Sequence, residues 1–208
     1  MSAIRREVVI AAVDRAYNLV DYNIHNSVDK RHEFKKQTVL IDKSLTEDEK
    51  TEAVRELNKM YDNNKVLNNE GTKRICETCN QECLATLYCE YCIRNYLKAN
   101  FSNWTSGNDD IDNLIQICQM ETLMPEKVVE WIPYDNLQNI KYLTEGGFSK
   151  IYTAQWINGS YWEWNSEKQQ LTREFEGGVQ YVILKRLENV ENANQSWLEE
   201  VCNLNIFR

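Results

Sequence analysis

The residues best suited to chemistry are clustered cysteines. The 208-residue chain contains seven cysteines, and four of them form two C-x-x-C pairs separated by nine residues: Cys76 with Cys79, and Cys89 with Cys92. Each pair can place two thiolates on one side of a tight turn, and two such turns complete a tetrahedral site of four thiolates. Sulfur ligands in this geometry favour zinc over hard cations, and four of them fill the coordination sphere. The sequence therefore predicts a structural zinc site.

Cys83 lies between the two pairs and would be a spare thiol or a replacement for one ligand. The alternative to zinc is a set of buried cysteines, or a knuckle that has lost its metal. Redox use of one C-x-x-C is disfavoured because no βαβ pattern surrounds it. Between positions 76 and 92 there are acidic residues but no basic one. This composition argues against an RNA-reading knuckle and favours a small structural or partner-binding module.

A second candidate site begins at a glycine pair. Gly146 and Gly147 lie between strand-like flanks, Lys185 ends the apolar run 182–184, and Glu200 follows in a predicted helix. A glycine turn lets backbone amides approach phosphate oxygens, a strand lysine contacts the α- and β-phosphates, and a helix glutamate holds that lysine. Taken singly, the pieces have simpler explanations: two glycines favour a plain hairpin turn, and a lysine at a strand end can extend into solvent.

In this order the pieces resemble the protein kinase family, in particular its tyrosine-kinase-like branch. The resemblance runs from Glu130-Trp-Ile-Pro-Tyr134 to Arg208 and covers the amino-terminal lobe only. The whole chain is similar to an expanded fungal group in which a helical, cysteine-rich leader precedes the kinase domain. The resemblance implies a Lys185–Glu200 pair, with Glu199 as the fallback partner. It also implies an ATP site formed by Leu143, Gly146, Gly147, Phe148, Ser149, Ile151 and Lys185.

The chain departs from the family pattern in several places. Thr144 and Ser149 occupy the first and third glycine positions of the family's G-x-G-x-x-G loop, and Ile183 replaces the usual small alanine before the lysine. The connection at 157–178 is unusually long and rich in aromatic residues. Each departure is expected to weaken nucleotide affinity without excluding it.

The catalytic motifs H-R-D and D-F-G do not occur in this sequence. Phosphoryl transfer needs the aspartate that accepts the substrate proton and the aspartate that holds magnesium. We therefore expect a kinase-like, ATP-binding lobe without catalytic activity of its own, with Mg²⁺ involved only in a complete kinase. The alternative is a pseudokinase-like interaction protein with a structural zinc module.

The elements that must position these residues predict an α+β fold. One apolar stripe predicts a helix over residues 3–24, and Thr46 with Glu49 predicts a capping box that begins a second helix. The predicted organisation is a helical leader (1–71), a Cys-rich zinc module (72–100), a helical linker (101–129) and a partial kinase lobe (130–208). That lobe would be an antiparallel sheet followed by a helix over residues 194–207.

Composition limits the partners. The net charge is −8 and no dense basic stripe is visible, which disfavours nucleic-acid binding. No apolar run approaches the ~18 residues of a membrane-spanning helix, and clustered cysteines suit a reducing, intracellular and cytoplasmic setting. Expected partners are ATP and proteins, as substrates or docking partners. His25 and His32 lie among polar residues and are interpreted as surface side chains.

Overall fold

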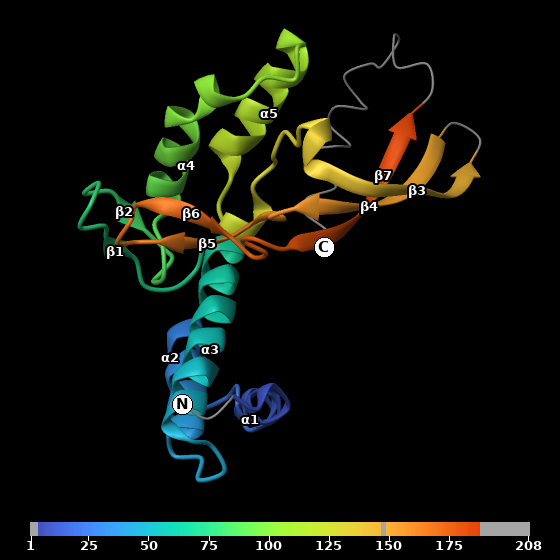
Figure 1. Cartoon of the computed structure of the whole chain (residues 1–208). Coiled ribbons are helices and arrows are strands. Elements are labelled where there is room, and N and C mark those ends of the chain that lie inside the picture. Colours follow the sequence, from blue (N-terminus) through green and yellow to red (C-terminus); the bar gives the residue numbers. More distant parts are fainter. Residues whose placement is uncertain (1–3, 147–148, 188–208) are drawn as a thin grey trace. The chain divides into compact units, whose positions relative to one another are not determined.

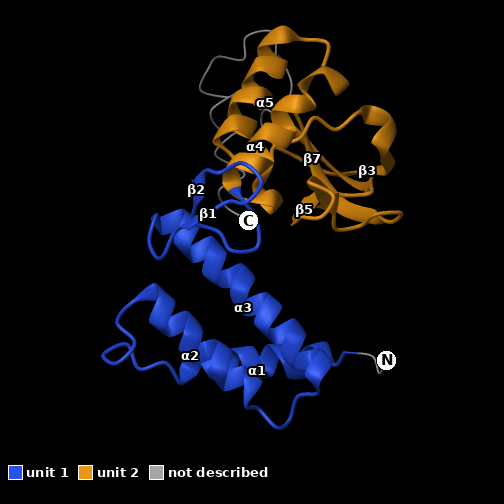
Figure 2. Cartoon of the chain, turned by 90° about the vertical axis from the view of Figure 1, so that its left-hand side faces the viewer, with its two compact units in different colours: residues 1–89 blue, residues 90–208 orange. Residues whose placement is uncertain are grey.

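The computed structural model describes residues 4–146 and 149–187, and it confirms the α+β class. Helices dominate the first part of the chain, and antiparallel strands dominate the last (Figure 1). The chain divides into two compact units, residues 1–89 and 90–208 (Figure 2), and each is described separately below.

The first unit contains three helices: α1 (Arg6–Asn18), α2 (Val28–Leu40) and α3 (Glu47–Asn68). They pack around one apolar core in which small side chains of α1 meet α3, so that the helices can approach closely. The buried members of this core are Val9, Ala12, Val13, Ala16, Val39, Leu45, Ala53 and Leu57.

The predicted start of α3 is confirmed. The Thr46 hydroxyl accepts from the N–H of Glu49 at 3.3 Å, and the Glu49 carboxylate accepts from the N–H of Thr46 at 2.9 Å. The helix ends before Asn69, which adopts the left-handed conformation (φ 50°) that asparagine tolerates better than most residues.

The sequence reasoning missed α2. Its apolar periodicity is weak, and the signal that was available is Ser27, whose hydroxyl accepts from the N–H of Lys30 at 3.2 Å as an N-cap. The surface interpretation of His32 is wrong, since its side chain is 8% exposed. The ring stacks on Tyr61 with centroids 4.0 Å apart, and its Nε2 lies 3.0 Å from Asn58 Oδ1.

A short hairpin completes the first unit. It comprises β1 (Arg74–Ile75) and β2 (Glu82–Cys83), which pair antiparallel.

The second unit begins with α4 (Glu90–Ala99) and α5 (Asp109–Glu121), which pack on each other. Single 3₁₀ turns follow these helices at Phe101–Asn103, Pro125–Lys127 and Tyr134–Asn136. The helical character expected for the linker 101–129 is present in α5, which buries Ile115 and Cys118.

A three-stranded antiparallel sheet follows, with the order β3 (Leu137–Gly146), β4 (Ser149–Ile157) and β7 (Val179–Leu187). The connection expected between β4 and β7 is not structureless. It forms a separate hairpin of β5 (Tyr161–Asn165) and β6 (Gln170–Arg173), which the aromatic spacing did not reveal. The apolar run 182–184 lies in β7, but its apolar character does not bury the strand: Tyr181 is 77% exposed and Ile183 is 62% exposed.

The helix predicted over residues 194–207 lies outside the described residues. Within the described part of the chain, none of the helices combines the length and the apolar character needed to cross a bilayer.

Candidate metal centre

The first C-x-x-C pair occupies the turn of the β1–β2 hairpin. Two backbone hydrogen bonds close this turn, from Asn80 N–H to the Cys76 carbonyl at 2.8 Å and from Cys76 N–H to the Gln81 carbonyl at 2.9 Å. Asn80 takes a positive φ of 55°, which reverses the chain just after Cys79. The turn therefore holds both thiols of the pair near one another.

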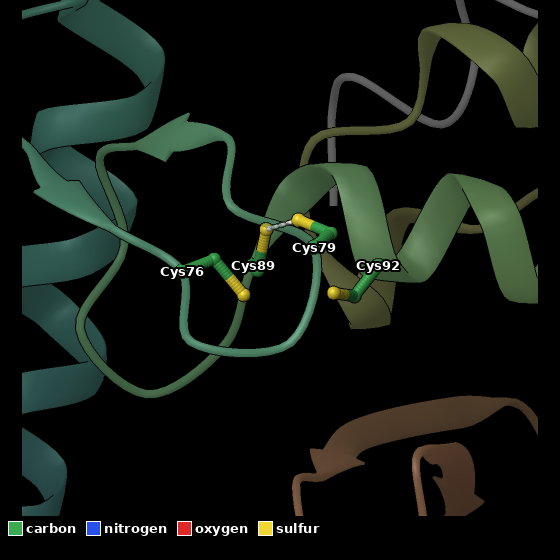
Figure 3. A group of neighbouring side chains, drawn as sticks. All are labelled: Cys76, Cys79, Cys89 and Cys92. Carbon is green, nitrogen blue, oxygen red and sulfur yellow. Dashed lines mark hydrogen bonds between the residues drawn. The ribbon is translucent and has the colours of Figure 1, made fainter.

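The second pair lies at the start of α4. Cys89 immediately precedes the helix, and Cys92 lies in its first turn, so the three-residue spacing places the two thiols on the same side. The four labelled side chains gather around one region between the hairpin turn and the start of α4 (Figure 3). The two halves of the predicted site are thus brought together.

The distances suit a tetrathiolate site. The sulfur atoms of Cys76, Cys79, Cys89 and Cys92 all lie within 4.8 Å of one another. The Sγ atoms of Cys79 and Cys89 are 3.6 Å apart, far beyond a disulfide bond of about 2.05 Å. With Zn–S bonds of about 2.3 Å, a regular tetrahedron has sulfur–sulfur edges of roughly 3.8 Å. The arrangement needs only small adjustments to close on a zinc ion.

The burial of the four cysteines favours a bound cation between their sulfur atoms. Cys76, Cys89 and Cys92 are each less than a tenth exposed, and Cys79 is partly exposed. Four thiolates at this depth would repel one another strongly in a low dielectric, and a divalent ion removes that penalty. The donor set therefore fits a closed, structural zinc site rather than a catalytic one with an open position.

The loop between the two pairs is anchored to α3 by Asp62, which is fully buried. Its carboxylate accepts from the N–H of Thr86 at 2.7 Å, from the Thr86 hydroxyl at 2.7 Å and from the N–H of Leu87 at 2.8 Å. Burial raises the pKa of Asp62, although these hydrogen bonds act in the opposite direction. The loop that carries Cys89 is thereby fixed to the helix.

Arg74 anchors the same loop from the hairpin. Its guanidinium donates from Nε to the carbonyl of Ala85 at 2.7 Å and from Nη2 to the carbonyl of Tyr88. Hydrogen bonds of this kind orient metal-bearing loops and are part of a metal site's design. Asp62 and Arg74 together define the path of the chain that leads into Cys89.

Cys83 is not one of the four clustered thiols. It is buried, and its sulfur lies within 4.8 Å of donor atoms of Cys89 and Glu90 in a second, three-residue group. Cys89 thus belongs to both groups. This geometry is consistent with the expectation that Cys83 is a spare thiol or a substitute for one ligand.

The residues expected to bind ATP lie on the three-stranded sheet. Leu143 and Gly146 are on β3, Ser149 and Ile151 are on β4, and Lys185 is on β7. Register places Ile151 directly opposite Lys185. Gly147, Phe148 and both glutamates proposed as the lysine's partner, Glu199 and Glu200, lie outside the described residues.

Sequence reasoning overlooked the buried Asp62 and a partly buried ion pair, Glu130 with Arg173. Asp62 lies five residues after Leu57 and four before Val66, so it continues the buried stripe of α3, and a charge in that stripe was the available signal. Glu130 and Arg173 are 43 residues apart, and no local pattern connects them.

Comparison of the chain with protein-family models, with curated proteins and with solved structures finds no match.

Proposed function

We propose that the chain is a protein-kinase-like polypeptide in which a structural zinc module precedes the nucleotide-binding strands of a kinase amino-terminal lobe. The observation that carries the proposal is the register of β4 with β7. Ile151 lies opposite Lys185, and Thr153 lies opposite Ile183 two residues along the same face. An apolar surface beside a strand lysine is what an adenine ring and its phosphates require.

Two further features support this assignment. The sheet is an antiparallel meander whose first connection, between Gly146 and Ser149, carries the glycine pair of the sequence. The face that holds Lys185 is open to solvent in the described residues, since Lys185 and Ile183 are both exposed. A nucleotide would reach this face without rearrangement of the strands.

The zinc module has a structural role in this proposal. Four thiolates leave no open position for a substrate or an activated water molecule. The ion would fix the hairpin turn to the start of α4 and so replace the apolar core that so short a segment cannot form.

The experiment is a thermal shift of the purified chain with and without Mg-ATP. A ligand present at about 100 times its Kd adds about 2.7 kcal/mol of stability, so the parent protein should melt at a higher temperature with ATP. Lys185→Met should abolish the shift. Arg186→Met is the matched control, because it removes a neighbouring positive charge on the opposite face of β7. ATP binding at this site would be contradicted if Mg-ATP did not raise the melting temperature of the parent protein. It would also be contradicted if Lys185→Met and Arg186→Met reduced that rise equally.

A second candidate function is protein binding without nucleotide. The observation that favours it is a pair of large side chains left in solvent two residues apart on one face of β7: Tyr181 is 77% exposed and Ile183 is 62% exposed. Exposed apolar groups that lie together mark interaction surfaces. A chain that shows no ATP shift but forms a complex lost in Tyr181→Ser would support this alternative, a pseudokinase-like interaction protein.

A further inference from the structure

A cavity of about 260 Å³ lies in the second unit, on the side of the sheet opposite the proposed nucleotide face. Trp156 lines it from β4, and Trp156 is an odd number of positions from Ile151 on a strand whose pairing with β7 is unbroken. Side chains at such positions point to opposite faces of a sheet. The cavity is therefore separate from the surface beside Lys185, and what it binds does not depend on the proposed function.

The charges at the cavity neutralise each other. Glu130 Oε2 accepts from Arg173 Nη2 at 2.7 Å, and Glu130 Oε1 accepts from the N–H of Tyr161 at 3.0 Å. Arg173 also donates to the carbonyl of Gly159, and its guanidinium lies 4.1 Å from the centre of the Tyr161 ring. An ion entering the cavity would find no unbalanced charge to pair with, so the site suits an uncharged ligand.

The rim of the cavity is rich in carboxamides. Asn103, Asn136 and Asn158 line it and are exposed. A carboxamide both donates and accepts hydrogen bonds, and a hydroxyl group does the same. A ligand that carries several hydroxyl groups could therefore pair with this rim, whereas a proline-rich peptide would offer mainly acceptors.

The deeper part of the cavity is aromatic and apolar, with a polar atom that lacks a partner. Leu97, Trp156 and Gln119 are buried there, and Trp131 forms part of the wall. Gln119 Nε2 donates to the Val129 carbonyl at 2.7 Å, which fixes the orientation of the amide because a carbonyl can only accept. Gln119 Oε1 is buried and accepts no hydrogen bond within the described residues. Buried acceptors of this kind call for a donor, which a hydroxyl group would supply after a small shift of the side chain.

From these features we infer that the cavity binds an uncharged, hydroxylated ring, that is, a sugar unit. The C–H faces of the ring would pack on Trp131, and its hydroxyl groups would pair with the asparagine rim. The cavity is less suited to stacking a nucleobase, because Arg173 already occupies a face of the Tyr161 ring and of the Trp156 ring.

The test titrates the full chain with glucose, N-acetylglucosamine, maltose, cellobiose and chitobiose, and follows tryptophan fluorescence together with calorimetry. At least one of these sugars should bind saturably with a Kd of about 1 mM or tighter. Asn136→Ala and Trp131→Ala should each weaken that binding by about tenfold or more. Asn113→Ala removes an exposed carboxamide of α5 outside the cavity and should leave it unchanged.

Adenosine and a proline-rich peptide serve as competing probes. Absence of saturable binding by every sugar would overturn the inference, and so would binding that Asn136→Ala and Trp131→Ala leave intact. Circular dichroism of each variant shows whether it remains folded, and Asn136→Ala, at the exposed rim, is the variant least able to disturb the core. Because Lys185→Met lies on the other face, it should abolish the ATP shift while leaving sugar binding unaffected, so the two proposals can fail separately.

Discussion

The carboxylate of Asp62 in α3 accepts a hydrogen bond of 2.7 Å from the backbone N–H of Thr86, which lies in the loop between the two C-x-x-C pairs. This contact joins the long helix of the leader to the candidate metal centre across 24 residues of sequence. Asp62 is a buried charged group that supports the site, so its removal should lower the free energy of unfolding.

Asp62→Ala should reduce the free energy of unfolding by about 2–4 kcal/mol, because two backbone N–H groups and a hydroxyl would lose a buried charged acceptor. Zinc should also be lost to a chelator at lower chelator concentration, since the loop that carries Cys89 is no longer held. Denaturant titration and chelator competition measure the two effects. Asn64→Ala, an exposed position on the same helix, is the control and should change stability by less than about 0.5 kcal/mol.

Zinc should co-purify with the chain at one ion per molecule under reducing conditions, and its removal by a chelator should lower stability. Cys79→Ser should abolish stoichiometric binding, because four thiolates are needed to close the site. Cys83→Ser is the matched control and should retain the ion, since Cys83 is outside the four-thiol group. Metal analysis of the parent, Cys79→Ser and Cys83→Ser measures the zinc content per chain and so tests this prediction. A parent protein with far less than one zinc per chain would show that these are buried cysteines only.

The stability of the first unit should depend on pH through His32. Burial lowers the pKa of His32 to about 4, with Lys35 and Lys36 acting in the same direction, whereas the unfolded chain has a histidine pKa of about 6.5. Between these values the unfolded state binds a proton that the folded state does not. Stability should therefore fall as the pH decreases from about 6.5 to about 4, by up to roughly 3 kcal/mol.

His32→Gln tests this account, because glutamine can still donate to Asn58 but does not titrate. The difference in unfolding free energy between parent and variant should change across this pH range. A parallel pH dependence of the parent and His32→Gln would show that the histidine is not responsible.

The capping box of α3 should contribute measurably to stability. Thr46→Ala should cost about 1 kcal/mol, because the N–H of Glu49 loses its acceptor at the helix start. Thr51→Ala is the comparison within the same helix. Its hydroxyl bonds only to the Glu47 carbonyl one turn earlier, so its loss should be nearly neutral. Equal losses at the two positions in thermal unfolding would contradict a specific role for the cap.

Local sequence patterns determined the parts of this protein that depend on neighbouring residues. The start of α3 followed from Thr46 and Glu49, because a capping box is closed by groups three residues apart. The candidate metal-binding group of Cys76, Cys79, Cys89 and Cys92 followed from the C-x-x-C spacing, since the short turns that bring each pair together are themselves local. The strands on either side of the glycine pair followed from the strand-like sequence of its flanks.

Only the tertiary structure decided what distant residues do for one another. It buried His32 against Tyr61, placed Asp62 beneath Thr86, paired Glu130 with Arg173 and folded the predicted connection into the β5–β6 hairpin. In each case a polar group is satisfied by a partner 9 to 43 residues away. The free energy of burying such a group depends on that partner and not on its sequence neighbours, so no local pattern could reveal it.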